Sequence, residues 1–402
     1  MEKRVVVTGL GVASSIGIGK DAFWESVISG KSGISELTLF DTSAHNTHVA
    51  GEIRNFDPNK FLKSKRDRFF GRASLMGLVA ANLAIEDSQI DIVSLQKNRT
   101  CVFMGTTMGE IQAMEKLNHD WVKLGLKDPG NFSIYRSLAY NISSLISLEL
   151  KLTGRNRIFT TACSSGNYAI SYGSDLLKSG KADMVLAGGS DAISWISFTG
   201  FNKVGATAPE KCQPFDKNRK GMIPAEGAGV LVLETLEGAK KRKAKIYAEI
   251  LGCGFSCDAH HMTQPSVEGI TKCISNALNE SRISPDDVDY ICAHGTGTLQ
   301  NDNAECSAIK NVFGDRKIPV SSIKSMIGHT MGAATAIAAV ACCKAVEYDI
   351  IPPTINFETA DPSCDIDCVP NVARKKKLNI VLNNGLAFGG NNACLVIKKF
   401  IK

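Results

Sequence analysis

One cysteine and two histidines lie in sequence settings that suit nucleophilic chemistry. Cys163 lies in Thr161-Ala-Cys163-Ser-Ser-Gly166, directly after a β-branched run and before a helix-like stretch that ends near Lys178. A thiol at a helix N-terminus meets exposed N–H groups and a partial positive charge, which favour the nucleophilic thiolate. Free cysteine is also among the most buried residue types, so a packed core residue is the alternative.

The two histidines are each flanked by glycine, which lets backbone and ligand approach closely. His294 lies in Ala293-His294-Gly-Thr-Gly-Thr298, and His329 lies in Lys324-Ser-Met-Ile-Gly-His329-Thr-Met-Gly332. A lone histidine is more often a core residue satisfied by a hydrogen bond. The informative unit is therefore the set of one cysteine and two histidines.

The elements that must position these residues alternate between strands and helices. We expect strands at Arg4–Thr8, Cys101–Met104 and 183–187, and a helix at 72–87, with each strand ending in glycine. This alternation predicts an α/β fold.

The second half of the chain repeats the events of the first. An expected strand at 4–8 matches one at 245–251, and a strand that opens into a Gly/Thr loop occurs at 100–107 and again at 289–297. A short polar strand end leads into a helix of small residues at 160–166 and at 320–329. Each half ends with an apolar strand that runs into a double glycine, at 185–189 and at 381–390. The charge-rich stretch 236–245 predicts a boundary, with halves 1–240 and 241–402. We expect two sheets with helices between them and a site where loops of both halves converge.

Composition restricts the class of protein. Of 402 residues, 44% are hydrophobic and 21% are charged, as in ordinary globular proteins, and the net charge of +6 includes no dense basic tract of the nucleic-acid-binding kind. Thirteen scattered cysteines indicate reduced thiols and a cytoplasmic protein. We expect neither a signal peptide nor a membrane span, because no segment approaches 18 uninterrupted apolar residues.

One glycine pattern and one pattern of cysteines and histidines resemble motifs of other functional classes. Gly9-Leu-Gly11 follows a strand like a dinucleotide-binding turn, but the third glycine is missing. Cys253, Cys257, His260 and His261 offer soft ligands, so a zinc-binding protein without enzymatic activity is an alternative, although the spacing is not that of a standard zinc finger. We predict no metal site.

Five ordered blocks resemble the elongating β-ketoacyl-[acyl-carrier-protein] synthases. They are Thr-Ala-Cys163-Ser-Ser, His294-Gly-Thr-Gly-Thr with Asn301-Asp-Asn-Ala-Glu305, Lys324-Ser-Met-Ile-Gly-His329, Phe388-Gly-Gly390, and Pro214-Phe-Asp216-Lys-Asn-Arg219 with Glu226-Gly-Ala-Gly229. The resemblance covers the whole chain. It implies a thiolase-like fold, which is a duplicated five-layer α-β-α-β-α sandwich, and a dimer.

The resemblance also implies roles for individual residues. Cys163 would accept an acyl group, and His294 and His329 would stabilise the enolate formed when malonyl-carrier protein loses carbon dioxide, giving a β-ketoacyl chain two carbons longer. Lys324 and Glu305 would serve the catalytic site, and Phe388 would supply an oxyanion N–H group and gate the acyl pocket. Substrate-binding positions would be Thr296, Thr298, Gly389 and Gly390. Each of these also has a plainer structural explanation as a cap, turn or core residue.

The resemblance implies an acyl carrier protein as partner, substrates carried on its phosphopantetheine, and no permanently bound cofactor. The basic stretch at residues 60–68 is either a solvated helix face or the dock for that acidic protein, through Lys63, Lys65 and Arg68. The chain would form a homodimer, or a heterodimer with a homologous chain-length subunit that lacks the cysteine. Neither a nucleic acid nor a membrane is an expected partner.

Departures from the family pattern leave the pathway open between fatty-acid and type II polyketide synthesis. Leu299-Gln300 replaces Pro-Leu, Leu386-Ala387-Phe388 replaces Phe-Gly-Phe, and Gly166 stands where a third serine is common. A thiolase-type acetyltransferase is less favoured, because it would need a second cysteine in the last glycine loop. A chain-starting synthase would be expected to have asparagine in place of His329.

Overall fold

The computed structural model describes residues 3–62, 70–125 and 135–401. Within these ranges, one sheet of eleven strands crosses the molecule. Its order is β11 (Val320–Ser321), β10 (Tyr290–Cys292), β14 (Ile380–Gly385), β15 (Asn391–Lys399), β9 (Ala248–Cys257), β1 (Val5–Ser14), β8 (Gly227–Thr235), β7 (Met184–Asp191), β5 (Thr100–Gly105) and β6 (Asn156–Phe159), with β2 (Gly17–Ile18) paired to β1.

The sheet is built from two equivalent sets of five strands. Outward from the centre, the first set runs β1-β8-β7-β5-β6 and the second runs β9-β15-β14-β10-β11. In both sets the order along the chain is first, fifth, fourth, second, third. The predicted duplication is therefore confirmed, whereas the boundary at residue 240, which α9 (Leu236–Lys241) crosses, stays a prediction.

The expectation of two separate sheets was wrong in one respect. Strands β1 and β9 pair antiparallel over three residues, Val5–Val7 against Ala248–Ile250, and this joins the two sets into one path. The pairing satisfies backbone groups that two free sheet edges would leave open.

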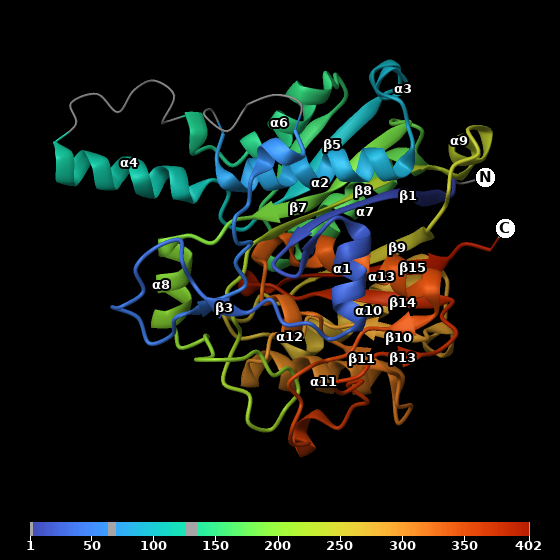
Figure 1. Cartoon of the computed structure of the whole chain (residues 1–402). Coiled ribbons are helices and arrows are strands. Elements are labelled where there is room, and N and C mark those ends of the chain that lie inside the picture. The colour runs from blue at the N-terminus through green and yellow to red at the C-terminus, as the bar shows by residue number, and fades with distance from the viewer. Residues whose placement is uncertain (1–2, 63–69, 126–134, 402) are drawn as a thin grey trace.

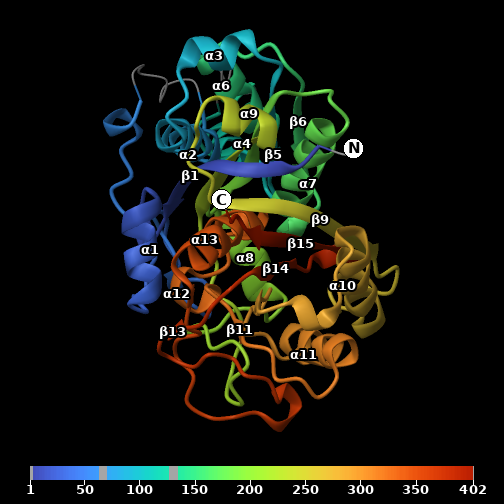
Figure 2. The same ribbon diagram turned by 90° about the vertical axis from the view of Figure 1, so that its right-hand side faces the viewer.

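Helices cover and separate the two sets, which gives five layers (Figure 1). The outer helices of the first set are α2 (Arg72–Ser88) and α6 (Asn141–Leu150). The middle layer consists of α7 (Ser165–Lys178) and α13 (Ala334–Tyr348). The second set is covered by α10 (Val267–Ser281) and α11 (Leu299–Phe313). A view from the side shows the same succession (Figure 2). This is the thiolase-like sandwich expected from the resemblance.

The remaining elements lie around these layers. They are α1 (Lys20–Ile28), β3 (Ser35–Glu36), β4 (Val49–Ala50), α3 (Ile92–Lys97), α4 (Ile111–Leu124), α8 (Trp195–Lys203), α12 (Lys324–Ile327), β12 (Ile350–Ile351) and β13 (Arg374–Lys375). Helix α4 projects from the body beside α8 (Figure 1).

The middle helix α13 consists mainly of alanine and other small apolar residues, so it fits between the two sheet halves. By length and composition alone, Met331–Tyr348 could cross a membrane. However, 89% of that stretch is buried inside the protein, as in the core helix of a soluble fold.

Gly9 and Gly11 lie within β1, which continues past the predicted end at Thr8. A Cβ at Gly9 would lie 2.2 Å from the Ala84 carbonyl oxygen, and one at Gly11 would lie 1.9 Å from that of Ala80. These glycines therefore allow α2 to pack closely on the strand. They do not form a dinucleotide-binding turn.

A buried amide cluster ties α7 to the second half. Asn167 Nδ2 donates to the carbonyls of Asn383 (2.9 Å) and Ala393 (3.0 Å), while Asn383 Nδ2 donates to Asn167 Oδ1 (3.0 Å) and the Thr335 carbonyl (2.8 Å). Both asparagines have no solvent exposure. The cluster fixes the helix that begins beside Cys163 against β14 and α13.

We predict that Asn167→Ala lowers the free energy of unfolding by about 2–3 kcal/mol, because it leaves buried carbonyls and one amide without partners. Urea denaturation followed by circular dichroism measures the change. Asn279→Ala, on the exposed side of α10, is the matched control. Equal stability of the two variants would contradict a stabilising role for the cluster.

Candidate active site

Cys163 lies in a tight turn, Ala162–Ser164, between β6 and α7. Ala162 has φ +49°, in the left-handed region, which costs an ordinary residue about 1–2 kcal/mol. Strain of this kind is concentrated at functional sites. The turn places Cys163 at the start of α7 with 8% of its surface exposed.

The second half contains the same turn before α13, at Met331–Ala333, where Met331 has φ +51°. Gly332 occupies the position that Cys163 holds in the first half. A Cβ at Gly332 would lie 2.5 Å from the Thr106 backbone, so this position has no room for a side chain. Only one of the two equivalent turns can therefore carry a thiol.

His294 follows β10, and its backbone is held on both sides. Its N–H donates to Glu305 Oε1 (2.8 Å), and its carbonyl accepts a hydrogen bond from Lys324 Nζ (2.6 Å). Glu305 Oε2 accepts from the Gly295 N–H (2.8 Å). Glu305 and Lys324 thus hold the backbone of the His294 loop, and both are buried.

His329 follows α12 and has a defined tautomer. Its Nδ1 accepts a hydrogen bond from the Met331 N–H (3.1 Å), which places the proton of the neutral ring on Nε2. Its backbone N–H donates to the Ile223 carbonyl (2.7 Å) in the first half. The ring lies 5.3 Å from that of His294, at an interplanar angle of 80°.

The three predicted residues meet in one place. The Cys163 sulfur and one nitrogen of each imidazole all lie within 4.8 Å of one another. In the described ranges this is the one group of three side chains close enough to share a metal ion, and the Cys253–His261 segment forms no such group. The zinc alternative therefore has no support in that segment.

Burial keeps all three groups neutral near pH 7. Desolvation lowers the pKa values of both His294 and His329 well below the ordinary value, and the Lys324 ammonium lowers them further. Desolvation also raises the pKa of Cys163 to about 12, although Lys324 and the N–H groups of Cys163 and Phe388 oppose the shift. The N–H groups beside the sulfur favour the thiolate, as expected for the start of a helix, but the effect of burial on the pKa is larger.

Phe388 lies in a short turn, Phe388–Gly390, after β14. Its N–H group and the N–H group of Cys163 both act to lower the pKa of the Cys163 thiol. The Phe388 side chain is 43% exposed, and its ring lies 6.3 Å from that of Phe201. Two N–H groups beside the sulfur also lie next to the carbonyl carbon of any acyl group on Cys163, which is where an oxyanion hole needs its donors.

A cavity of about 300 Å³ opens onto the sulfur. Of the predicted residues it is lined by Cys163, His294, His329, Thr296, Thr298 and Phe388. Thr298 also caps α11, and its hydroxyl lies 2.9 Å from that of Thr296. Lys324, Glu305, Gly389 and Gly390 are not among the residues that line this cavity, and Lys63, Lys65 and Arg68 lie outside the described residues.

The prediction from sequence missed Asp191, a buried carboxylate at the end of β7. It accepts hydrogen bonds from the Thr106 hydroxyl (2.6 Å), the Thr107 N–H (2.7 Å) and the Gly332 N–H (2.6 Å) of the other half. Desolvation raises its pKa to about 6. The sequence signal that could have identified Asp191 is its place at the carboxyl end of a buried strand, directly after Gly188-Gly-Ser190.

Comparison with known proteins identifies the family and the fold. Residues 2–239 match the family model of the β-ketoacyl synthase N-terminal domain, and residues 247–358 match that of the C-terminal domain. The chain belongs to the β-ketoacyl synthase family. Two curated relatives named 3-oxoacyl-[acyl-carrier-protein] synthase 2 are 40% identical, from Coxiella burnetii (strain RSA 493 / Nine Mile phase I), and 36% identical, from Staphylococcus aureus (strain COL); each alignment covers 99% of both chains.

Solved structures of other β-ketoacyl synthases are also similar over the full chain. The ishigamide ketosynthase/chain length factor has a TM-score of 0.97 at 40% identity, with 100% of both chains covered. A ketosynthase bound to a hexaketide, in complex with its type II polyketide acyl-carrier protein, has a TM-score of 0.93 at 32% identity, again with 100% of both chains covered. The family and the thiolase-like fold predicted from the motifs are confirmed.

We predict that alkylation of Cys163 by iodoacetamide accelerates about tenfold per pH unit from pH 6 to 9 without a plateau, because only the thiolate reacts and its pKa is about 12. Peptide mass spectrometry resolves Cys163 from the exposed Cys257. A plateau at or below pH 8 would show that the resting group is a thiolate.

Proposed function

We propose that this chain is an elongating β-ketoacyl-[acyl-carrier-protein] synthase, an acyltransferase that joins an acyl chain to a malonyl unit. The main support is the convergence of one thiol and two imidazoles, from different halves, within 4.8 Å beside a cavity. Family membership and full-length relatives of that name support the same activity.

The first step transfers the acyl group to the enzyme. The Cys163 sulfur attacks the acyl thioester carbonyl, and the N–H groups of Cys163 and Phe388 hold the oxyanion. Because the resting thiol is neutral, its proton passes through an adjacent imidazole to the departing pantetheine sulfur. An acyl-Cys163 thioester and a free carrier protein remain.

The second step is decarboxylative condensation. Malonyl-carrier protein loses carbon dioxide, and the enolate oxygen accepts hydrogen bonds from His294 and from His329 Nε2–H, whose proton is fixed by the Met331 contact. The enolate carbon then attacks the acyl-Cys163 carbonyl and releases the Cys163 thiolate, which takes up a proton from water and returns to the neutral thiol. The product is a β-ketoacyl chain two carbons longer.

The other predicted residues support these steps. Lys324 and Glu305 position His294 through its backbone. Thr296 and Thr298 bind the phosphopantetheine arm, Gly389 and Gly390 shape the turn beside it, and Phe388 gates the acyl pocket. We propose no permanently bound cofactor, a cytoplasmic location, and the two structural halves 1–240 and 241–402.

A second function has specific support. The chain is as similar to the ishigamide ketosynthase/chain length factor as to the 3-oxoacyl-[acyl-carrier-protein] synthase 2 of Coxiella burnetii, at 40% identity each. The second candidate is therefore the catalytic subunit of a heterodimer in type II polyketide synthesis. Condensation by the purified chain alone favours a homodimer, whereas activity that requires a cysteine-less homologue favours the heterodimer. The thiolase alternative lacks support, because Cys394 is buried in β15 and does not line the cavity.

We predict that intact-mass spectrometry with a panel of acyl-carrier proteins shows a mass gain equal to one acyl group. The Cys163→Ala variant should show none, because the acceptor sulfur is gone. A gain that persists in the variant would remove Cys163 from the mechanism.

We also predict that exchanging Lys63, Lys65 and Arg68 for Glu weakens carrier-protein affinity about tenfold at low salt, because the partner is acidic. Exchanging the exposed Lys240, Lys241 and Lys243 for Glu makes the same change in net charge elsewhere and is the control. Equal affinities of the two triple variants would place the dock elsewhere.

A further inference from the structure

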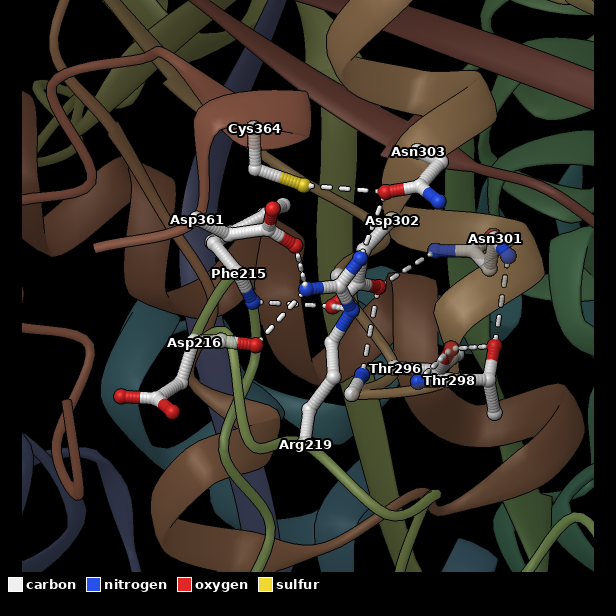
Figure 3. A network of polar contacts seen from close by, with 12 residues as sticks. Phe215, Asp216, Arg219, Thr296, Thr298, Asn301, Asp302, Asn303, Asp361 and Cys364 are labelled. Carbon is white, nitrogen blue, oxygen red and sulfur yellow. Dashed lines mark hydrogen bonds and ion pairs between the residues drawn. The ribbon is translucent and has the colours of Figure 1, made fainter. Parts of the chain in front are cut away.

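Arg219 borders the active-site cavity, yet its side chain has no solvent exposure. Its Nη1 donates to the Asp216 carbonyl (2.7 Å) and to Asp361 Oδ2 (2.5 Å), and its Nη2 donates to Asn303 Oδ1 (2.5 Å; Figure 3). These bonds turn the guanidinium toward protein atoms of three separate segments. Arg219 is therefore placed to position other residues and not to bind substrate itself.

Asp302 is the partner that connects Arg219 to the cavity wall. The Arg219 Nε lies 3.6 Å from Asp302 Oδ2, and both side chains are fully buried. Asp302 also accepts hydrogen bonds from the N–H groups of Phe215 (2.9 Å) and Gly297 (3.2 Å). One carboxylate thus joins the Arg219 segment of the first half to the Gly297 loop of the second (Figure 3).

Arg219 is one of three groups that stabilise the charge of Asp302. Desolvation raises the pKa of Asp302 to about 6, and the Phe215 N–H group, the Asn301 amide and the Arg219 guanidinium oppose this shift. The carboxylate is therefore ionised at neutral pH, and a buried charge needs a partner. Without the guanidinium, Asp302 would either take up a proton or move, and its bond to Gly297 would weaken.

Gly297 separates Thr296 from Thr298, whose hydroxyls lie at the cavity wall. Its N–H is held by Asp302, and its carbonyl accepts from the Gly221 N–H (2.9 Å), two residues after Arg219. At φ +80°, Gly297 is in a conformation that permits this sharp turn. The Arg219 segment therefore holds the backbone between the two threonines, while the Thr298 hydroxyl also caps α11.

The catalytic histidine of the same loop is held by different groups. His294 is fixed by Glu305 and Lys324, neither of which bonds to Arg219 in the described part of the chain. Loss of Arg219 should therefore displace the two threonines and leave the thiol and imidazoles in place.

We propose that Arg219 and Asp302 form a buried latch between the two halves that orients Thr296 and Thr298 for the phosphopantetheine arm of the carrier-bound substrates. Through the latch, arm affinity depends on the alignment of the first half with the second. This inference rests on the proposed condensing activity and assigns Arg219 a positioning role that is separate from bond making.

Arg219→Met should raise the KM for malonyl-carrier protein about tenfold while kcat stays within about threefold, because arm binding is lost and the reacting groups are not. The rate of Cys163 alkylation by iodoacetamide, which needs no arm, should be unchanged. Arg219→Lys should recover part of the affinity, since it keeps the charge but cannot bridge three segments. Arg242→Met, which breaks a half-buried ion pair with Glu234, is the matched control and should not change KM.

A double-mutant cycle with the paired substitution Thr296→Val/Thr298→Val tests the connection. In that background Arg219→Met should have little further effect on KM if it acts through the loop. Additive effects, an unchanged KM in Arg219→Met, or a parallel fall in alkylation rate would each overturn the latch. If Arg219→Met does not fold, Asp302→Asn carries the same test, with the same outcomes. Failure of the proposed function would differ, because the wild type itself would then form no β-ketoacyl product.

Discussion

The active site depends on how two halves of one chain are held against each other across the helices α7 and α13. Cys163 lies in the turn before α7 in the first half, and the two imidazoles follow β10 and α12 of the second half. No local segment therefore contains the whole site. Buried polar contacts set this alignment: the Asn167 and Asn383 amides in the core, and Asp191 bonded to Gly332. The Cys163 sulfur and one nitrogen of each imidazole lie within 4.8 Å of one another, so a shift of one half by about an ångström would move them apart.

The same burial determines the chemistry. Burial raises the pKa of the thiol and lowers those of both imidazoles, so the resting site carries three neutral groups. Neutral imidazoles still donate hydrogen bonds, and a low-dielectric site strengthens those bonds when charge develops on an oxygen. Lys324 places one positive charge behind His294 without entering the cavity lining.

Duplication explains how one fold supplies both parts of the site. Each half has the same strand order and the same strained turn before a central helix, at Ala162 and at Met331. The first turn carries Cys163, whereas the second carries Gly332, whose N–H group bonds to Asp191 across the interface. Equivalent turns have thus taken different roles, one supplying the nucleophile and the other holding the halves together.

The sequence by itself determined the α/β class, the duplication, the family and the set of Cys163, His294 and His329, because these follow from periodicity and from short motifs that survive in linear order. Tertiary structure alone decided what those residues do to each other. The pKa of Cys163 depends on burial by distant segments, the tautomer of His329 on the Met331 amide, and the pairing of β1 with β9 on two strands about 240 residues apart. Sequence motifs contain or adjoin Asp191, Arg219 and Asp302, but their partners Gly332, Asp361 and Gly297 lie on other segments, so only folding showed what each of them holds.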